Sequence, residues 1–437
     1  MIIYNVLGRI IRTFFQLFYK RIYITGLENI PKDKPIFFAA NHSNALIDGF
    51  IVAIFLIGHR TCYFLGRASI FGNKILDWLF DAVQIIPIYR PRDGEDYTTK
   101  NITTFQKVDE ELLKKKSILI FPEGNCVKER RLRPLKKGTV RMSFSAWEKG
   151  ADVHIIPTGI NYTEHNEARS EVMLSFGKPI RIQDYATQFE QNPAAAYDAV
   201  NEDLRLAITS EMVLFEDAEN DELIHRLLEI SRNDFQEKSN AIMSNNPERL
   251  QMEREIASRI NHLAQDNKQQ LETLRSETTA YFKALEAVDT TDKALVNYEQ
   301  PTSFLIRLIA PLVMVLSAVL HFPLRVFKPL AKKMTVKEPT MFVTIWTGFV
   351  MGFYLLFAIL LITLGLTTIP LWKAVGLGLG IAILTFGTGL ILEKYKADKA
   401  ILSLKKIARV SPQEIAALKE MRLDLKSLSC HFQEQSR

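Results

Sequence analysis

Residues 21–185 alternate short apolar runs of strand length with amphipathic stretches of helical length. Such alternation is typical of an α/β unit, in which strands form a sheet and the intervening helices cover its faces. We therefore expect an α/β domain over residues 21–185, with a mixed sheet flanked by helices. The runs expected to form strands are residues 35–40, 61–65, 83–88, 117–121, 153–160 and 172–176.

Residues 186–300 follow a different pattern, rich in charges and helix formers, with Leu and Ile at helical spacing. This pattern predicts a charged helical region in which two or more long helices pack as a hairpin. His225 and His262 are isolated in it, so we interpret them as structural or exposed residues. The role of this region stays open.

The C-terminal part predicts a membrane anchor. Residues 339–372 carry no charge, and residues 374–392 form a second charge-free run that ends at Glu393. A spanning helix needs about 20 apolar residues, so we expect two transmembrane helices over 339–393, joined by a tight turn.

Two further stretches are expected at the membrane surface. Residues 1–20 mix apolar side chains with Arg9 and Arg12, which favours an interfacial amphipathic helix over a cleaved signal. An ordinary core helix is the alternative. Residues 301–338 include an apolar stretch, 308–320, that is short for a span, so we expect an amphipathic or re-entrant segment.

The net charge of +6 favours an anionic partner, either a membrane surface or a phosphorylated substrate, and no nucleic-acid-binding motif accompanies it. Basic residues flank the expected hairpin on both sides, so the positive-inside rule places both flanks in the cytoplasm, including a helical tail over 394–437. The α/β unit is then cytoplasmic too, unless 308–320 crosses the membrane. Three cysteines without a pairing pattern agree with a reducing compartment.

Candidate chemistry begins where the run 35–40 ends. His42 would follow that strand directly, and Asp48 would lie one to two turns into the next helix. A carboxylate near an imidazole holds its tautomer and stabilises its cationic form, as a general base requires. The alternative is a capped helix with an incidental histidine.

A second candidate stretch follows the run 117–121. Pro122-Glu123-Gly124 comes directly after it, and from Lys128 to Arg141 seven basic residues stand against one acid, Glu129. Runs of charge often form a solvated face. At this place, however, the run is well positioned to hold a phosphate or the anionic part of an acyl carrier.

Four short motifs occur in a defined order within one domain's length. They are Asn41-His42 with Asp48, Ile86-Pro87-Ile88-Tyr89-Arg90, Phe121-Pro122-Glu123-Gly124, and Ile155-Ile156-Pro157. Over roughly residues 20–185 this order resembles the glycerolipid acyltransferase family. The resemblance implies a membrane-bound O-acyltransferase of phospholipid synthesis. It would move a fatty acyl group from a thioester, acyl-CoA or acyl carrier protein, to glycerol-3-phosphate or 1-acylglycerol-3-phosphate, without a cofactor or metal.

In this hypothesis His42 is the general base, Asp48 orients it, and the substrate hydroxyl attacks the thioester directly. The residues expected to bind substrate are Arg67, Arg90, Glu123, Gly124, Lys128 and Arg130.

Two departures from the family pattern bear on the expected acceptor and on the residue expected to bind its phosphate. Five residues separate His42 from Asp48 where the family usually has four. The longer spacing resembles a subset that includes the fungal glycerol-3-phosphate/dihydroxyacetone-phosphate acyltransferases, which favours glycerol-3-phosphate as acceptor. Asn125-Cys126 stands where the family usually has Thr-Arg, so Lys128 or Arg130 would have to replace that arginine. A ping-pong scheme through the Cys126 thiol is an alternative that the mechanism does not need.

Two other functions compete with this one. The first is a non-catalytic, lipid-binding membrane scaffold whose helical region binds a partner. The second is a lysophospholipid hydrolase, but the chain has no Gly-x-Ser-x-Gly nucleophile motif.

Overall fold

The computed structural model describes residues 2–56, 60–94, 96–165, 167–237, 241–336, 341–368 and 370–431. The chain divides into two compact units. The first unit comprises Met1–Leu214 with Ser239–Leu250, and the second comprises Phe215–Lys238 with Gln251–Arg437. The expected acyltransferase domain ends at residue 185, whereas the first unit continues through α6 (Ala186–Gln191) and α7 (Pro193–Ser210).

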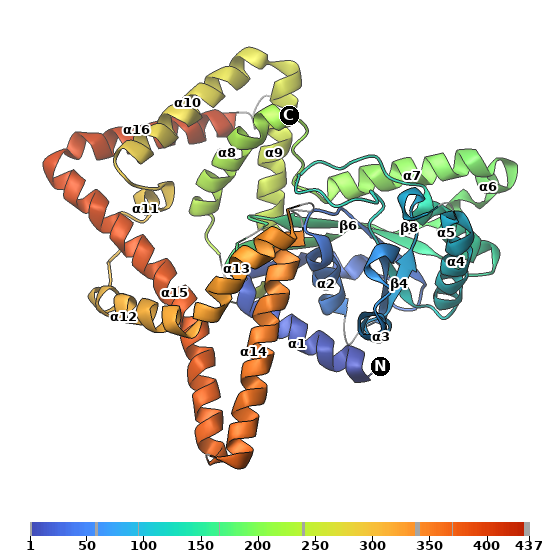
Figure 1. Ribbon diagram of the computed structural model, residues 1–437. Helices are drawn as coiled ribbons and strands as arrows, with labels where there is room; N and C mark the ends of the chain where they lie inside the picture. The colour runs from blue at the N-terminus through green and yellow to red at the C-terminus, as the bar shows by residue number, and fades with distance from the viewer. Residues whose placement is uncertain are drawn as a thin grey trace. The chain divides into compact units, whose positions relative to one another are not determined.

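The first unit is built on a nine-stranded mixed sheet (Figure 1). Its strands are β1 (Arg21–Thr25), β2 (Ile36–Ala40), β3 (Cys62–Arg67), β4 (Ile85–Ile88), β5 (Ser117–Ile120), β6 (His154–Tyr162), β7 (Glu171–Phe176), β8 (Ile180–Arg181) and β9 (Met243–Ser244). They are ordered β4-β3-β5-β2-β6-β7-β1-β9, and β8 pairs with β6. Strands β4, β3, β5, β2 and β6 are mutually parallel, while β6 is antiparallel to β7 and β8.

All six expected strands are present as β2 to β7, each within two residues of its predicted bounds. The central strands β2, β5 and β6 are buried along their whole length, which explains why they form continuous apolar runs in the sequence. Strands β1, β8 and β9 were not predicted. The last two have only two residues each, too few to produce a pattern.

Helices cover both faces of this sheet. Alternate side chains such as Phe37, Ile118 and Ile155 point to one face, where they pack with α4 (Tyr97–Leu113), α5 (Gly138–Glu148) and α7. Burying one such side chain stabilises the fold by roughly 1.5–3 kcal/mol. Helix α2 (Ala45–Leu56) lies on the opposite face, where the backbone at Gly49 approaches the Phe64 ring of β3. Helix α3 (Lys74–Ala82) lies between β3 and β4 in the chain.

Helix α1 (Ile2–Phe18) occupies the expected amphipathic segment and packs against α2. Its side chains Tyr4, Ile11 and Phe15 are buried in the first unit, while Val6 and Ile10 are about half exposed. The helix therefore packs one row of apolar side chains into the first unit and leaves other apolar side chains exposed.

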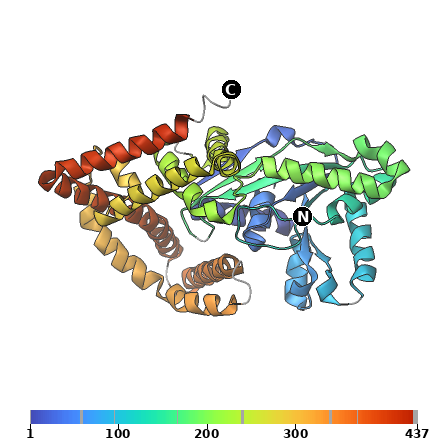
Figure 2. The same cartoon turned by 90° about the horizontal axis from the view of Figure 1, so that it is seen from above.

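The second unit is helical over its described residues. Its helices are α8 (Asp221–Asp234), α9 (Glu248–Asp266, from residue 251 on), α10 (Lys268–Ala287), α11 (Asp292–Val296), α12 (Phe304–Leu320), α13 (Phe322–Met334), α14 (Phe342–Thr367), α15 (Leu371–Val410) and α16 (Pro412–His431). The prediction of long helices between residues 186 and 300 is confirmed, but their packing as a hairpin is wrong. Helix α10 packs against α8 and α16 instead, and Figures 1 and 2 both show α10 beside α16.

A buried ion pair and a buried hydrogen bond hold α10 and α16 together. The buried carboxylate of Asp292 accepts hydrogen bonds from Arg422 of α16 at 2.7 Å and from the Tyr281 hydroxyl of α10 at 2.5 Å. A buried charge is stable only when it is paired, so these two contacts join α10, α11 and α16.

By length and composition, one described helix can cross a membrane by itself: Thr344–Thr367, within α14, of which 6% is buried. The bent pair of α12 and α13, which meet at 64°, counts as another only if it forms one broken span. The second expected span, 374–392, lies within the 40-residue helix α15, which packs against α14 (Figure 1). Residues 337–338 of the expected amphipathic segment, 339–340 and 369 of the expected hairpin and 432–437 of the expected tail lie outside the described ranges.

Candidate active site

The carboxyl ends of five parallel strands meet at one edge of the sheet in the first unit. The expected site residues follow or end these strands: His42 after β2, Arg67 at the end of β3, Arg90 after β4 and Glu123 after β5. Ligands of parallel α/β sheets bind beyond this edge. Parallel pairing therefore brings together residues that are up to 81 positions apart in the chain, as the bond between His42 and Glu123 shows.

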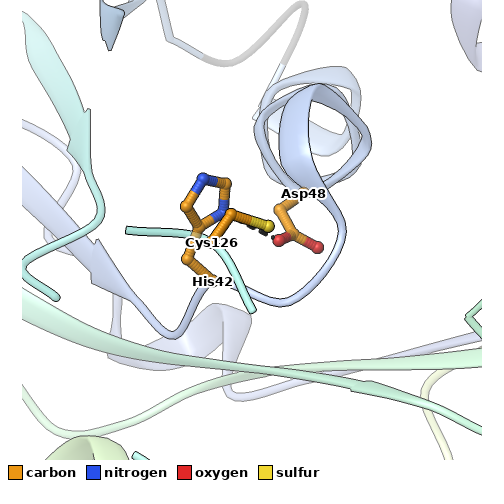
Figure 3. Close-up of side chains that lie close together, drawn as sticks. All are labelled: His42, Asp48 and Cys126. Carbon is orange, nitrogen blue, oxygen red and sulfur yellow. Dashed lines mark hydrogen bonds and ion pairs between the residues drawn. The ribbon is translucent and has the colours of Figure 1, made fainter. Parts of the chain in front are cut away.

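His42 and Asp48 form the expected pair. The Nδ1 atom of His42 lies 2.9 Å from Oδ2 of Asp48, as Figure 3 shows by a dashed line. The Asp48 side chain is fully buried, whereas 14% of the His42 side chain is exposed. The carboxylate therefore holds one ring nitrogen, and the other nitrogen points away from the carboxylate (Figure 3).

The Asp48 carboxylate is held on both oxygens. Its Oδ2 accepts the backbone N–H groups of Ser43 at 2.8 Å and Asn44 at 2.7 Å, and its Oδ1 accepts the Tyr162 hydroxyl at 2.7 Å. Burial raises the pKa of Tyr162 well above its ordinary value, so the phenol stays protonated and donates. These donors replace water around a buried charge and fix the orientation of the carboxylate.

The longer spacing between His42 and Asp48 is accommodated at Ala45, the first residue of α2. Its φ of 45° is in the left-handed region, which residues other than Gly, Asn and Asp seldom adopt. The turn thus takes up the additional residue before the helix begins, and Asp48 still reaches the imidazole.

Glu123 is hydrogen-bonded to the backbone of His42. Its Oε1 accepts the backbone N–H of His42 at 2.8 Å, and its Oε2 accepts both the backbone N–H and Nε of Arg133 at 3.2 Å. Burial raises the pKa of Glu123 above its ordinary value, and the donated hydrogen bonds oppose that rise. The carboxylate thus positions the loop that carries His42, whereas Gly124, with a φ of 72°, forms the turn after it.

A cavity of about 220 Å³ opens beside His42. Its cationic lining residues are Arg67, Arg90 and Lys136, and the His42 ring is stacked on Phe121 with centroids 3.9 Å apart. Asp93 holds the Arg90 guanidinium through two contacts of 3.2 Å, which orient it without removing all its donors. A compact anion in this cavity would lie among three cationic side chains and beside the imidazole.

Three of the expected substrate-binding residues, Glu123, Lys128 and Arg130, do not line this cavity, whereas Gly124 does. Arg130 is outside this lining and donates to the backbone carbonyls of Tyr162 and Thr163, at 2.5 and 3.0 Å. Lys128 is also outside the lining, and burial lowers the pKa of its half-buried ammonium. From the basic run, Lys136 reaches the cavity. Its backbone N–H donates to the Pro122 carbonyl at 2.7 Å, which ties the run to the Pro-Glu-Gly turn.

Sequence reasoning did not find Tyr162 or the stacking of Phe121 on His42. Tyr162 is 114 residues from its partner Asp48, and nothing in its local pattern distinguishes it from a core tyrosine. Its position at the carboxyl end of a parallel strand was the one usable signal.

The Sγ atom of Cys126 lies near the same pair (Figure 3). One donor atom each from His42, Asp48 and Cys126 lies within 4.8 Å of the others, and all three residue types are metal ligands. Among the described residues, this group has the composition of a metal site.

Comparisons with known proteins find acyltransferases. Residues 21–161 match the protein-family model for Acyltransferase. "Glycerol-3-phosphate O-acyltransferase 1" of Saccharomyces cerevisiae is 36% identical over 100 residues, which are 22% of this chain and 13% of that protein. "1-acyl-sn-glycerol-3-phosphate acyltransferase BAT2, chloroplastic" of Brassica napus is 30% identical over 140 residues, 31% of this chain and 37% of that protein. The chain thus spans well under half the length of these relatives.

Among solved structures, "1-acyl-sn-glycerophosphate (LPA) acyltransferase, PlsC" from Thermotoga maritima is similar with a TM-score of 0.33 and 19% identity, covering 46% of this chain and 76% of that one. The family match coincides with the part of the first unit that holds His42, Asp48 and the cavity. Residues 21–161 are therefore an acyltransferase domain, similar to part of the glycerol-3-phosphate and 1-acylglycerol-3-phosphate acyltransferases.

Proposed function

We propose that the chain transfers a fatty acyl group from a thioester to a hydroxyl of glycerol-3-phosphate, or of 1-acylglycerol-3-phosphate. One observation carries this proposal: His42, held by Asp48, opens onto the same cavity as Arg67, Arg90 and Lys136. A base and a set of phosphate-binding cations side by side are what a phosphate-bearing alcohol requires.

The chemistry follows from the hydrogen bonds of His42. With Nδ1–H donated to Asp48, Nε2 presents a lone pair to the cavity side. Nε2 takes the proton of the substrate hydroxyl as its oxygen attacks the thioester carbonyl. The new C–O bond forms, the C–S bond breaks, and the imidazolium returns the proton to the departing thiolate. Asp48 stabilises the imidazolium between these two steps.

The size of the cavity favours a small polar acceptor. Its volume of about 220 Å³ is below the roughly 300–1,000 Å³ of sites that enclose drug-sized ligands. A glycerol-phosphate headgroup fits that volume, and an acyl chain has to lie outside it. The names of the yeast relatives agree with glycerol-3-phosphate as acceptor.

We further propose that the chain is an integral membrane protein. Helix α14 and the charge-free half of α15 would form the two-span hairpin, because they are consecutive, apolar and packed together. Their basic flanks favour a cytoplasmic location for both ends and for the acyltransferase domain. The exposed apolar residues of α1 and the bent α12–α13 pair are suited to the membrane surface.

The test is acyl transfer by detergent-purified full-length protein. Labelled acyl-CoA and labelled acyl carrier protein are each offered with glycerol-3-phosphate, dihydroxyacetone phosphate and 1-acylglycerol-3-phosphate. We expect product from one acceptor, lost in His42→Ala and retained in His262→Ala, which changes an exposed histidine of α9. Lipid binding by the folded wild type without product from any pair would instead favour a non-catalytic scaffold.

A further inference from the structure

Cys126 is a neighbour of the His42–Asp48 pair that the proposed acyl transfer does not use. Its Sγ accepts the backbone N–H of Ala45 at 3.0 Å. Ala45 is the first residue of α2, so this N–H has no partner within the helix and carries the positive end of the helix dipole. The Sγ atom is thus held at the start of α2, and its thiolate is the form that binds metals.

The three donor atoms match the ligands of Zn²⁺. Imidazole nitrogen, carboxylate oxygen and thiolate bind Zn²⁺ at about 2.0–2.3 Å, which places neighbouring donors of a tetrahedron about 3.3–3.6 Å apart. In the structure the His42 and Asp48 donors are 2.9 Å apart, and all three donors lie within 4.8 Å. Small shifts are therefore enough, and Cys126 can make them because it lies in the irregular segment between β5 and α5.

From this geometry we infer that His42 Nδ1, Asp48 Oδ2 and Cys126 Sγ form an inhibitory site for a thiophilic divalent cation, Zn²⁺, that stops acyl transfer by occupying the hydrogen bond between base and carboxylate. The metal forms bonds to nitrogen, oxygen and sulfur. The Nδ1 proton of neutral His42 moves to Nε2, and the Cys126 thiol proton is released to solvent, with no change of oxidation state.

The inhibition follows from the tautomer. With the metal on Nδ1, the neutral ring carries its proton on Nε2, and no lone pair remains to accept the substrate proton. The two backbone N–H groups of Ser43 and Asn44 continue to hold Asp48 Oδ2, so the loop keeps its fold. The effect on catalysis rests on the proposed function, whereas binding of the metal does not.

The first arm of the test measures binding alone. Untagged, detergent-purified full-length protein in metal-free buffer is titrated with Zn²⁺ by calorimetry and with Co²⁺ by absorption, where a sulfur-to-cobalt charge-transfer band reports a thiolate ligand. The variant Cys126→Ser keeps an acceptor for the Ala45 N–H but loses the soft ligand. Cys62→Ala, at a fully buried cysteine in β3, is the matched control.

We expect the wild type and Cys62→Ala to bind one Zn²⁺ and to give the cobalt band. Cys126→Ser should lose the band and bind Zn²⁺ at least about 100-fold more weakly, since even partners outside the ligand set change metal affinity by 10–100-fold. His42→Ala should weaken binding similarly. Equal affinity and an unchanged band in Cys126→Ser and the wild type would overturn the site.

The second arm measures acyl transfer against buffered free Zn²⁺. We expect inhibition of the wild type that a chelator reverses, and a half-inhibitory concentration at least about 100-fold higher in Cys126→Ser, in line with the loss of a ligand. Equal inhibition of both proteins would refute the inhibitory role. If the wild type binds Zn²⁺ through Cys126 but makes no acyl product without metal, the proposed function fails while the metal site stands.

Discussion

Removing the Tyr162 hydroxyl tests how the active-site carboxylate is held. In Tyr162→Phe, Asp48 Oδ1 loses a donor at 2.7 Å inside a site where Asp48 is fully buried and Tyr162 is 1% exposed. Water cannot replace the donor there. A hydrogen bond to a charged group contributes about 1.5–3 kcal/mol. The variant therefore leaves the carboxylate less well oriented to stabilise the imidazolium.

The expected result is a change in turnover without a change in acceptor binding. If the lost free energy falls on the imidazolium state, kcat decreases about 10- to 100-fold, because 1.36 kcal/mol corresponds to a factor of ten. KM for the acceptor should stay the same, since Tyr162 does not line the cavity. Steady-state acyl transfer with varied acceptor concentration measures both constants.

Tyr19→Phe is the matched control. Tyr19 is as buried as Tyr162, and their ring centroids lie 6.3 Å apart, but in the described structure it gives no hydrogen bond to Asp48. We expect Tyr19→Phe to retain kcat. An unchanged kcat in Tyr162→Phe, or equal losses in the two variants, would refute the assigned contact. A thermal unfolding curve for each variant separates lost catalysis from lost folding.

The remaining predictions test the cavity, the loop and the turn. Lys136→Ala should raise the acceptor KM about tenfold or more with kcat little changed, because Lys136 lines the cavity. The control Lys32→Ala, at an exposed lysine outside the cavity, should leave KM unchanged. Burial raises the pKa of Glu123, which favours folding below the unfolded pKa of about 4.3. This contribution is lost as the pH rises from the unfolded pKa through the folded pKa of Glu123. Between these two pKa values, the unfolding temperature of the wild type should therefore fall relative to that of Glu123→Gln. Ala45→Gly relieves the strain of a φ of 45° and should raise the unfolding temperature. The control Ala53→Gly, inside α2, should lower the free energy of unfolding by about 1 kcal/mol. A lower unfolding temperature in both variants would contradict backbone strain at Ala45.

Local patterns in the sequence determined the strands and the motif positions. Strands β2, β5 and β6 are buried on both faces, so most of their residues are apolar, and the sequence shows this as predominantly apolar runs at residues 35–40, 117–121 and 153–160. The same holds for α14, because its charge-free run in the sequence predicts a long apolar helix. The pairing of His42 with Asp48 was also predictable, since the two are only six residues apart.

Contacts between distant segments depended on the tertiary structure. The register of parallel strands brings Tyr162 to Asp48 and Glu123 to His42. From a run of basic residues the fold selects Lys136 for the cavity and turns Arg130 to two backbone carbonyls. The physical reason is that a charge or hydroxyl has the same local pattern whether it faces solvent, a carbonyl or a ligand. Its partner is set by packing of the strands and loops around it, which the neighbouring residues do not encode.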